Sequence, residues 1–89
     1  MDETDDARLH ALAHDQPAFA RTLGMKLISF SRDAVVATLE VGPGLINRNG
    51  MLHGGATMAL ADNLGGTATL LNLAPGETTT TIESKTNFF

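Results

Sequence analysis

One long, mostly apolar segment, residues 54–73, constrains most strongly what this chain can fold into. Alanine and leucine recur there at helical spacing, at Ala56, Leu60, Leu64, Ala68 and Leu71. Further apolar residues cover much of the remaining circumference, and a helix of this kind has to be buried. The segment therefore predicts one long helix with other elements packed around it, ending before Pro75 and Gly76.

Two adjacent glycines, Gly65 and Gly66, lie in the interior of this predicted helix. Each costs about 1 kcal/mol of helix stability relative to alanine. We therefore expect a packing reason for them, such as close contact with a sheet or with another helix.

The first part of the chain predicts two short helices. Acidic residues follow the candidate N-caps Thr4 and Asp5, which favours a helix over residues 6–14. A second helical turn is expected after Pro17 and should end at Gly24, a typical C-terminal stop.

Three strands are predicted. Residues 26–31 and 34–41 are rich in β-branched or alternating side chains and favour an antiparallel hairpin, with its turn at Ser31-Arg32-Asp33. Residues 78–89, with four consecutive threonines, favour a final strand. Three strands cannot wrap a helix of about 20 residues, which at ~1.5 Å per residue is close to 30 Å long. We therefore expect either partner chains that complete the sheet or a sequence that is a fragment.

Composition restricts the class of protein. The 89 residues, 43% hydrophobic and 18% charged, suit one globular domain over residues 1–89. Without cysteine there is neither a disulfide framework nor a thiolate metal site. The net charge of −4, without a cluster of basic residues, argues against nucleic-acid binding. An acidic start and the lack of a long apolar run predict no signal peptide and no membrane contact, which fits a cytoplasmic protein.

A polar loop leads directly into the predicted long helix. The N–H groups of Gly54 and Gly55 would be unpaired donors at the positive end of the helix dipole, with no side chain to block an approaching group. Such donors suit a developing oxyanion, and Asn47 could add a side-chain amide or hold a water nearby.

Asp62 is the single carboxylate of the predicted helix, and its apolar neighbours predict that it is buried. A buried carboxylate needs compensation or has a function. Asp62 follows Gly54 by eight residues, or ~12 Å along the axis, too far to reach a group held at Gly54 of the same chain. Two such helices packed antiparallel about a two-fold axis would bring Asp62 of one chain beside Gly54 of the other. The spacing therefore predicts a site shared between two chains.

The same segment resembles the hotdog-fold acyl-CoA thioesterases of the phenylacetate-pathway type. The similarity runs through Asn47-Arg48-x-Gly50-x-Leu52-His53-Gly54-Gly55, then Asp62-Asn63, and loosely through residues 81–89. It implies an α+β hotdog fold, in which an antiparallel sheet wraps around one long central helix, and a homodimer or homotetramer. Family members normally carry three further strands, so we expect this chain to be C-terminally truncated.

The resemblance also implies an activity, hydrolysis of the thioester bond of an acyl- or aryl-coenzyme A without cofactor or metal. The Gly54 amide would polarise the thioester carbonyl, and Asp62 of the partner chain would be nucleophile or general base. Asn47 would position the carbonyl or the water. The other implied site residues are His53, which shapes the loop and contacts the thioester, Thr81, which orients the attacking water, and the substrate-binding residues Gly55 and Arg48.

Other interpretations stay open at this point. The chain could be a non-catalytic acyl-CoA-binding or dimerisation module of hotdog fold, whereas a hotdog dehydratase is disfavoured because such enzymes pair histidine with a carboxylate in other motifs. His53 could simply bond to loop backbone. His10 and His14 have the i, i+4 spacing of metal ligands but lack a third one, which favours a solvated helix face.

Overall fold

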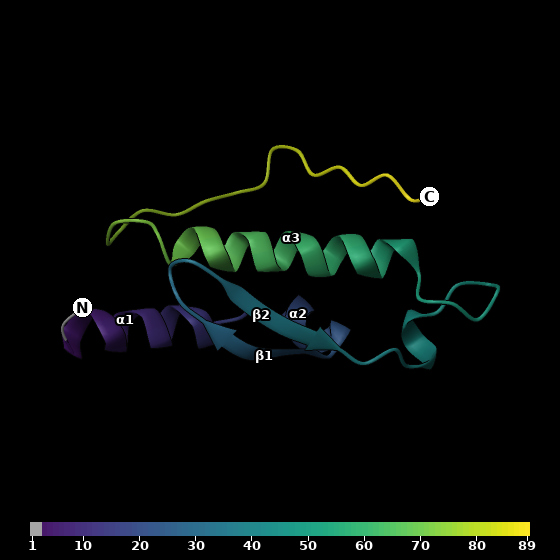
Figure 1. Cartoon of the computed structure of the whole chain (residues 1–89), viewed down its shortest axis with the longest axis horizontal. Coiled ribbons are helices and arrows are strands. Elements are labelled where there is room, and N and C mark those ends of the chain that lie inside the picture. The colour runs from purple at the N-terminus through teal and green to yellow at the C-terminus, as the bar shows by residue number, and fades with distance from the viewer. Residues whose placement is uncertain (1–2) are drawn as a thin grey trace.

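The long helix α3 (Gly54–Leu70) lies between a two-stranded sheet and an extended C-terminal segment (Figure 1). This arrangement is that of a computed structural model, which describes residues 3–89, with side chains from Asp5 onwards. A small antiparallel sheet against one long helix is compatible with part of a hotdog fold. Within residues 3–89, none of the helices combines the length and the hydrophobicity needed to cross a bilayer.

Two helices precede the sheet, α1 (Glu3–His14) and α2 (Ala18–Leu23). Because α1 begins at Glu3, Thr4 and Asp5 lie inside it, and their prediction as N-caps is wrong. The carboxylate of Asp5 instead accepts two hydrogen bonds of 2.8 Å from Arg32, which tie α1 to the turn of the hairpin. The predicted stop at Gly24 is confirmed, since its φ of 80° is left-handed and its N–H donates to carbonyls of α2.

The predicted hairpin is confirmed as strands β1 (Met25–Phe30) and β2 (Val35–Leu39), which pair antiparallel with a bulge between Leu27 and Ser29. Its turn is closed by the N–H of Ser31, which donates to the carbonyl of Ala34 at 2.8 Å. A 3₁₀ turn, η1 (Pro43–Leu45), then leads the chain towards α3.

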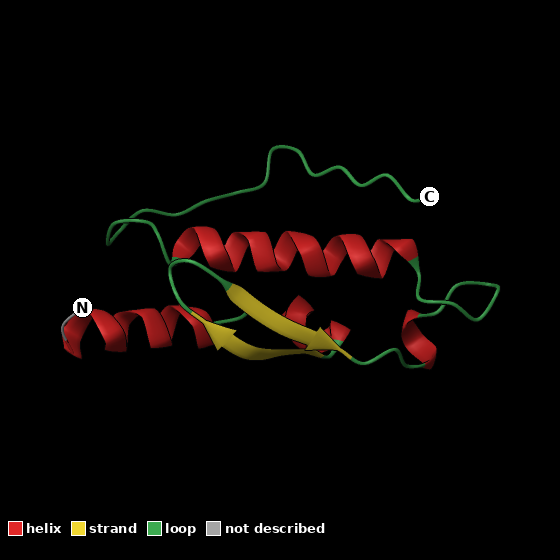
Figure 2. Ribbon diagram, viewed as in Figure 1, coloured by secondary structure: helices red, strands yellow, loops and turns green. Residues whose placement is uncertain are grey.

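The core is smaller than the sequence predicts. It centres on Leu9, Ala13 and Leu71, packed against partly buried side chains of the hairpin. Of the α3 residues, Ala56 and Thr67 are the ones that are fully buried. The prediction that α3 is largely buried is therefore wrong for the single chain, because α1, α2 and the hairpin cover one side of the helix (Figure 2).

The prediction of a final strand over residues 78–89 is also wrong. These residues are exposed and extended but form no strand (Figure 2). A strand needs a neighbour for its N–H and C=O groups, and the hairpin lies on the opposite side of α3 (Figure 1). High β-propensity alone, here from the threonines, does not supply that neighbour.

The expected close contact at Gly65 and Gly66 is absent. A Cβ atom built at either glycine meets no atom within 4 Å among the described residues. The helix therefore bears the cost of two glycines that no packing contact in this chain requires.

We expect Gly65→Ala to stabilise the fold by about 1 kcal/mol, because alanine is the better helix former and the site has room for its methyl group. Urea unfolding measures the effect. Gly24→Ala is the matched control and should destabilise, because alanine disfavours the left-handed backbone of Gly24. A loss of stability in Gly65→Ala would mean that the space beside α3 is occupied.

Candidate active site

His53 begins α3 as its N-cap. Its Nδ1 atom accepts a hydrogen bond of 2.8 Å from the N–H of Gly55, and its carbonyl accepts from Ala56 and Thr57. The expectation that both glycine amides are unpaired is therefore wrong for Gly55. Among residues 3–89, the N–H of Gly54 has no hydrogen-bond partner. Gly54 is thus the amide in the first turn of α3 that remains able to bind an anionic oxygen.

The loop before α3 is organised by Asn47. Its Oδ1 atom accepts from the N–H groups of Asn49 at 2.9 Å and Met51 at 3.1 Å, and its own N–H donates to the carbonyl of Met51. A short bridge between Ile46 and Leu52 closes the loop at its base. The side-chain oxygen of Asn47 is consequently occupied by the loop, and its amide NH₂ is the part left to face a substrate.

The structure brings Thr81 to Asp62. The Thr81 hydroxyl donates a hydrogen bond of 2.6 Å to Oδ1 of Asp62, across 19 residues of sequence. Asp62 is exposed in the single chain, so the prediction of its burial is wrong here. Asp62 lies on the side of α3 that the C-terminal segment passes (Figure 1). Its second oxygen, Oδ2, has no partner within the described part of the chain.

Gly54 and Asp62 are not brought together within one chain. Both lie on α3, eight residues apart, so the regular rise of the helix separates them by ~12 Å along its axis. This is the separation that the sequence predicts. Within one chain, the two groups therefore cannot act together on a single carbonyl group.

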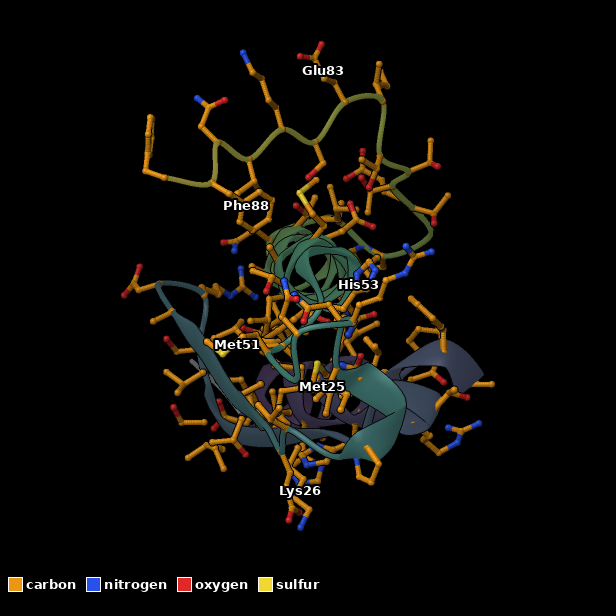
Figure 3. The ribbon with its side chains drawn as sticks, turned by 90° about the vertical axis from the view of Figure 1, so that its right-hand side faces the viewer. Met25, Lys26, Met51, His53, Glu83 and Phe88 are labelled. Carbon is orange, nitrogen blue, oxygen red and sulfur yellow. The ribbon has the colours of Figure 1, made fainter. Side chains whose placement is uncertain are left out.

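The C-terminal segment crosses both candidate groups. Thr81 contacts Asp62, and further along the segment the Phe88 ring lies against Gly54, with its Cζ 3.4 Å from an ideal Cβ position there. Figure 3, which looks along α3 from its N-terminal end, shows Phe88 directed towards the helix. Phe88 is not among the site residues predicted from sequence, because only the folded path of the C-terminal segment brings its ring close to Gly54.

A cavity of about 760 Å³ adjoins Asp62 and Thr81. It lies between the second half of α3, the linker between α1 and α2, and residues 79–84. Its wall contains a chain of hydrogen bonds: Asn63 donates to Gln16 at 2.9 Å, Gln16 donates to Thr67 at 3.1 Å, and Thr67 donates back to the Asn63 carbonyl at 3.0 Å. Gln16 lies in no recognisable sequence motif, so its hydrogen bonds to Asn63 and Thr67 cannot be predicted from sequence.

The remaining candidates lie at the surface. Arg48 is exposed in the loop before α3 and forms no ion pair among the described residues. His10 and His14 stack on each other, with ring centroids 4.3 Å apart, and both meet the edge of Phe30. In the described part of the chain, no three histidine, cysteine or acidic side chains are grouped for a metal.

Residues 49–89 match the thioesterase superfamily, a range that includes His53, Gly54, Asp62 and Thr81. Two curated proteins, both named "Putative esterase", are similar. One, from Deinococcus radiodurans, is 47% identical over 53 residues, which are 60% of this chain and 33% of that protein. The other, from Haemophilus influenzae, is 34% identical over 65 residues, which are 73% of this chain and 47% of that protein.

The chain thus spans from a third to about half the length of these curated relatives. No solved structure matches. The matches support the resemblance to hotdog thioesterases and indicate hydrolysis of a thioester or ester as the chemistry of the related proteins.

We expect His53→Ala to destabilise the fold by about 1 kcal/mol, because the variant leaves the Gly55 N–H without its cap. His53→Asn, which keeps a side-chain acceptor at the cap, should retain most of the stability. Denaturant unfolding of the two variants beside the unchanged chain measures the difference. Equal stability of His53→Ala and the unchanged chain would contradict the capping role.

Proposed function

We propose that the protein acts in hydrolysis of the thioester bond of an acyl- or aryl-coenzyme A, at a site formed by two copies of the chain. The observation that carries the proposal is the pairing on one helix of a free Gly54 amide and an Asp62 carboxylate whose Oδ1 is held by Thr81. The match of residues 49–89 to the thioesterase superfamily supports the reaction type.

In this mechanism the thioester carbonyl oxygen accepts a hydrogen bond from the Gly54 N–H of one copy. The positive end of the α3 dipole stabilises the negative charge that develops on this oxygen. Asp62 of the second copy then acts in one of two ways. It attacks the carbonyl carbon, which expels the coenzyme A thiolate and leaves an anhydride that water hydrolyses, or it takes a proton from a water that attacks directly.

Thr81 positions Asp62 for either route. Because its hydroxyl occupies Oδ1, the carboxylate presents Oδ2 to the carbonyl carbon or to the water. In this proposal Thr81 acts by positioning Asp62. The family resemblance instead implies that Thr81 orients the attacking water directly.

The geometry of α3 supports a site formed by two copies. Antiparallel packing of two α3 helices about a two-fold axis places Gly54 of each beside Asp62 of the other and produces two equivalent sites. Asp62 is exposed in the single chain although the C-terminal segment passes it, so its Oδ2 atom stays accessible to a group from the second copy. We propose a homodimer, or a homotetramer built from such dimers.

Residues of the loop before α3 complete the proposed site. The NH₂ group of Asn47 positions the carbonyl or the water, while its oxygen holds the loop. His53 and Gly55 act structurally through the helix cap, which aims the Gly54 amide. Arg48, exposed beside this loop, suits a phosphate of coenzyme A.

A second function is a non-catalytic acyl-CoA-binding or dimerisation module. The observation that favours it is the contact of the Phe88 ring with Gly54, which restricts the approach of a carbonyl to that amide. One measurement distinguishes the two functions: a thioesterase releases free thiol from an acyl-CoA, whereas a non-catalytic module does not.

We expect Asp62→Asn to lower thioester turnover by a factor of about 100 or more, because the amide is neither nucleophile nor base. A coloured thiol reagent measures the released coenzyme A without background, since the chain contains no cysteine. Asp33→Asn, in the exposed hairpin turn, is the matched control. Undiminished turnover in Asp62→Asn would exclude the mechanism.

A mixing experiment tests whether the site is shared. Gly54→Pro removes the N–H but suits the first position of a helix, and His53 already has the extended backbone that precedes proline. Gly54→Ala keeps the N–H and is the control. We expect Gly54→Pro and Asp62→Asn each to be inactive alone. Mixed and re-associated, they should recover about a quarter of the activity, because half of the dimers then contain one intact site of two. If confirmed mixed dimers recover no activity, the proposal that Gly54 of one chain and Asp62 of the other form one site is contradicted.

A further inference from the structure

We propose that the cavity beside Asp62 is an acyl pocket that prefers uncharged acyl groups to acyl groups ending in a carboxylate. The inference rests on the proposed thioester hydrolysis and adds a substrate class and a selecting residue, Asp15. It is carried by the position of the cavity, the bare backbone at its floor and the sign of the charges that line it.

The cavity has the volume of a small-molecule site. Its volume of about 760 Å³ lies within the range of roughly 300–1,000 Å³ that is usual for ligand pockets. Asp62 and Thr81 are among its lining residues, so an acyl group bound there begins next to the proposed reacting carboxylate. Apolar side chains contribute to several of its sides: Leu12, Pro17, Ala61, Leu70 and Ile82.

The two glycines of α3 keep this space open. Gly65 and Gly66 follow Asp62 by three and four residues, which places them on the same face of the helix one turn further on. Both line the cavity, and a Cβ atom at either would point into empty space. An acyl chain that extends from a carbonyl at Asp62 can therefore lie across bare backbone. Space for an acyl chain would account for Gly65 and Gly66, which no contact among the described residues explains.

The ionisable side chains that line the cavity are all acidic: Asp15, Asp62 and Glu83, with no lysine, arginine or histidine among the described lining residues. Glu83 is directed away from α3 (Figure 3). Asp15 and Asp62 therefore determine the charge of the pocket. A second carboxylate at the end of an acyl chain would meet like charge without a cation to compensate it.

Asp15 is held in place at the cavity. Its N–H donates to the carbonyl of Ala11 at 3.0 Å, and its neighbour Gln16 is tied to α3 through Asn63 and Thr67. Asp15 forms no ion pair within the part of the chain that the structure describes. Its exposed side chain therefore brings a negative charge to the rim of the cavity without a basic partner among the described residues.

The test compares two thioesters of equal chain length, hexanoyl-CoA and adipoyl-CoA, which differ by a terminal carboxylate. We expect kcat/KM for hexanoyl-CoA to exceed that for adipoyl-CoA by about fivefold or more. In Asp15→Asn this ratio should fall towards one, and Asp15→Glu should restore it. The exposed Asp33→Asn is the control and should leave the ratio as it is. An unchanged ratio in Asp15→Asn, or equal rates for both thioesters, would overturn the proposal.

A variant at the pocket floor gives a second readout. Gly66→Leu should lower kcat/KM for hexanoyl-CoA by about tenfold more than for acetyl-CoA, because the new side chain fills the space and leaves the reacting end free. Leucine favours a helix over glycine, so the loss would not come from unfolding. Equal losses for both substrates would place the acyl group elsewhere.

A binding measurement separates this inference from the proposed reaction. Titration calorimetry with the non-hydrolysable thioether analogues of the same two coenzyme A derivatives reports the charge preference without turnover. If no thioester is hydrolysed but the neutral analogue binds about fivefold more tightly, the proposed hydrolysis fails and the pocket stands. If thioesters are hydrolysed and the two analogues bind equally, the pocket proposal fails alone.

Discussion

The rigid rise of α3 is the constraint on which the proposed site depends. An α-helix separates residues eight positions apart by ~12 Å, and side-chain motion does not close that distance. Gly54 and Asp62 are therefore held apart within a chain, and in the proposed dimer the same helix sets their spacing between two chains. A flexible loop in place of α3 would permit a site in one chain, whereas the helix permits a site only between two copies. In the proposed mechanism, oligomerisation and catalysis therefore depend on the same helix.

The helix cap decides which amide is available. His53 uses its Nδ1 atom for Gly55, and this bond fixes the entry of the chain into α3. Gly54, one residue earlier, keeps its N–H unpaired at the positive end of the helix among the described residues. A histidine at the cap thus distinguishes two adjacent glycines, one with a structural role in the cap and one whose N–H is a candidate for binding. The sequence pattern marks the pair, but only the direction of the imidazole ring distinguishes them.

Much of the fold can be predicted from local patterns, and the errors share one physical cause. The hairpin, the stop at Gly24 and the start of α3 depend on residues close in sequence, and all three are confirmed. The burial of Asp62 and the strand over residues 78–89 depend on what lies beside them, which hydrophobic periodicity does not identify. In the site, Gly54, Asp62 and Thr81 can be found from sequence. Gln16 and Phe88 cannot, because their partners are 47 and about 34 residues away along the chain.

The cavity beside Asp62 explains a conflict between local preference and the observed helix. Gly65 and Gly66 weaken α3 by about 1 kcal/mol each, and the fold gains no contact in return. Natural sequences depart from local preference mainly where a binding or reacting group needs space. The two glycines lie one turn from the proposed reacting carboxylate, at the floor of the cavity, where side chains would occupy the volume that a substrate needs. In this proposal the stability of α3 is balanced against access to Asp62, and the glycines mark the side of α3 on which the proposed acyl pocket lies.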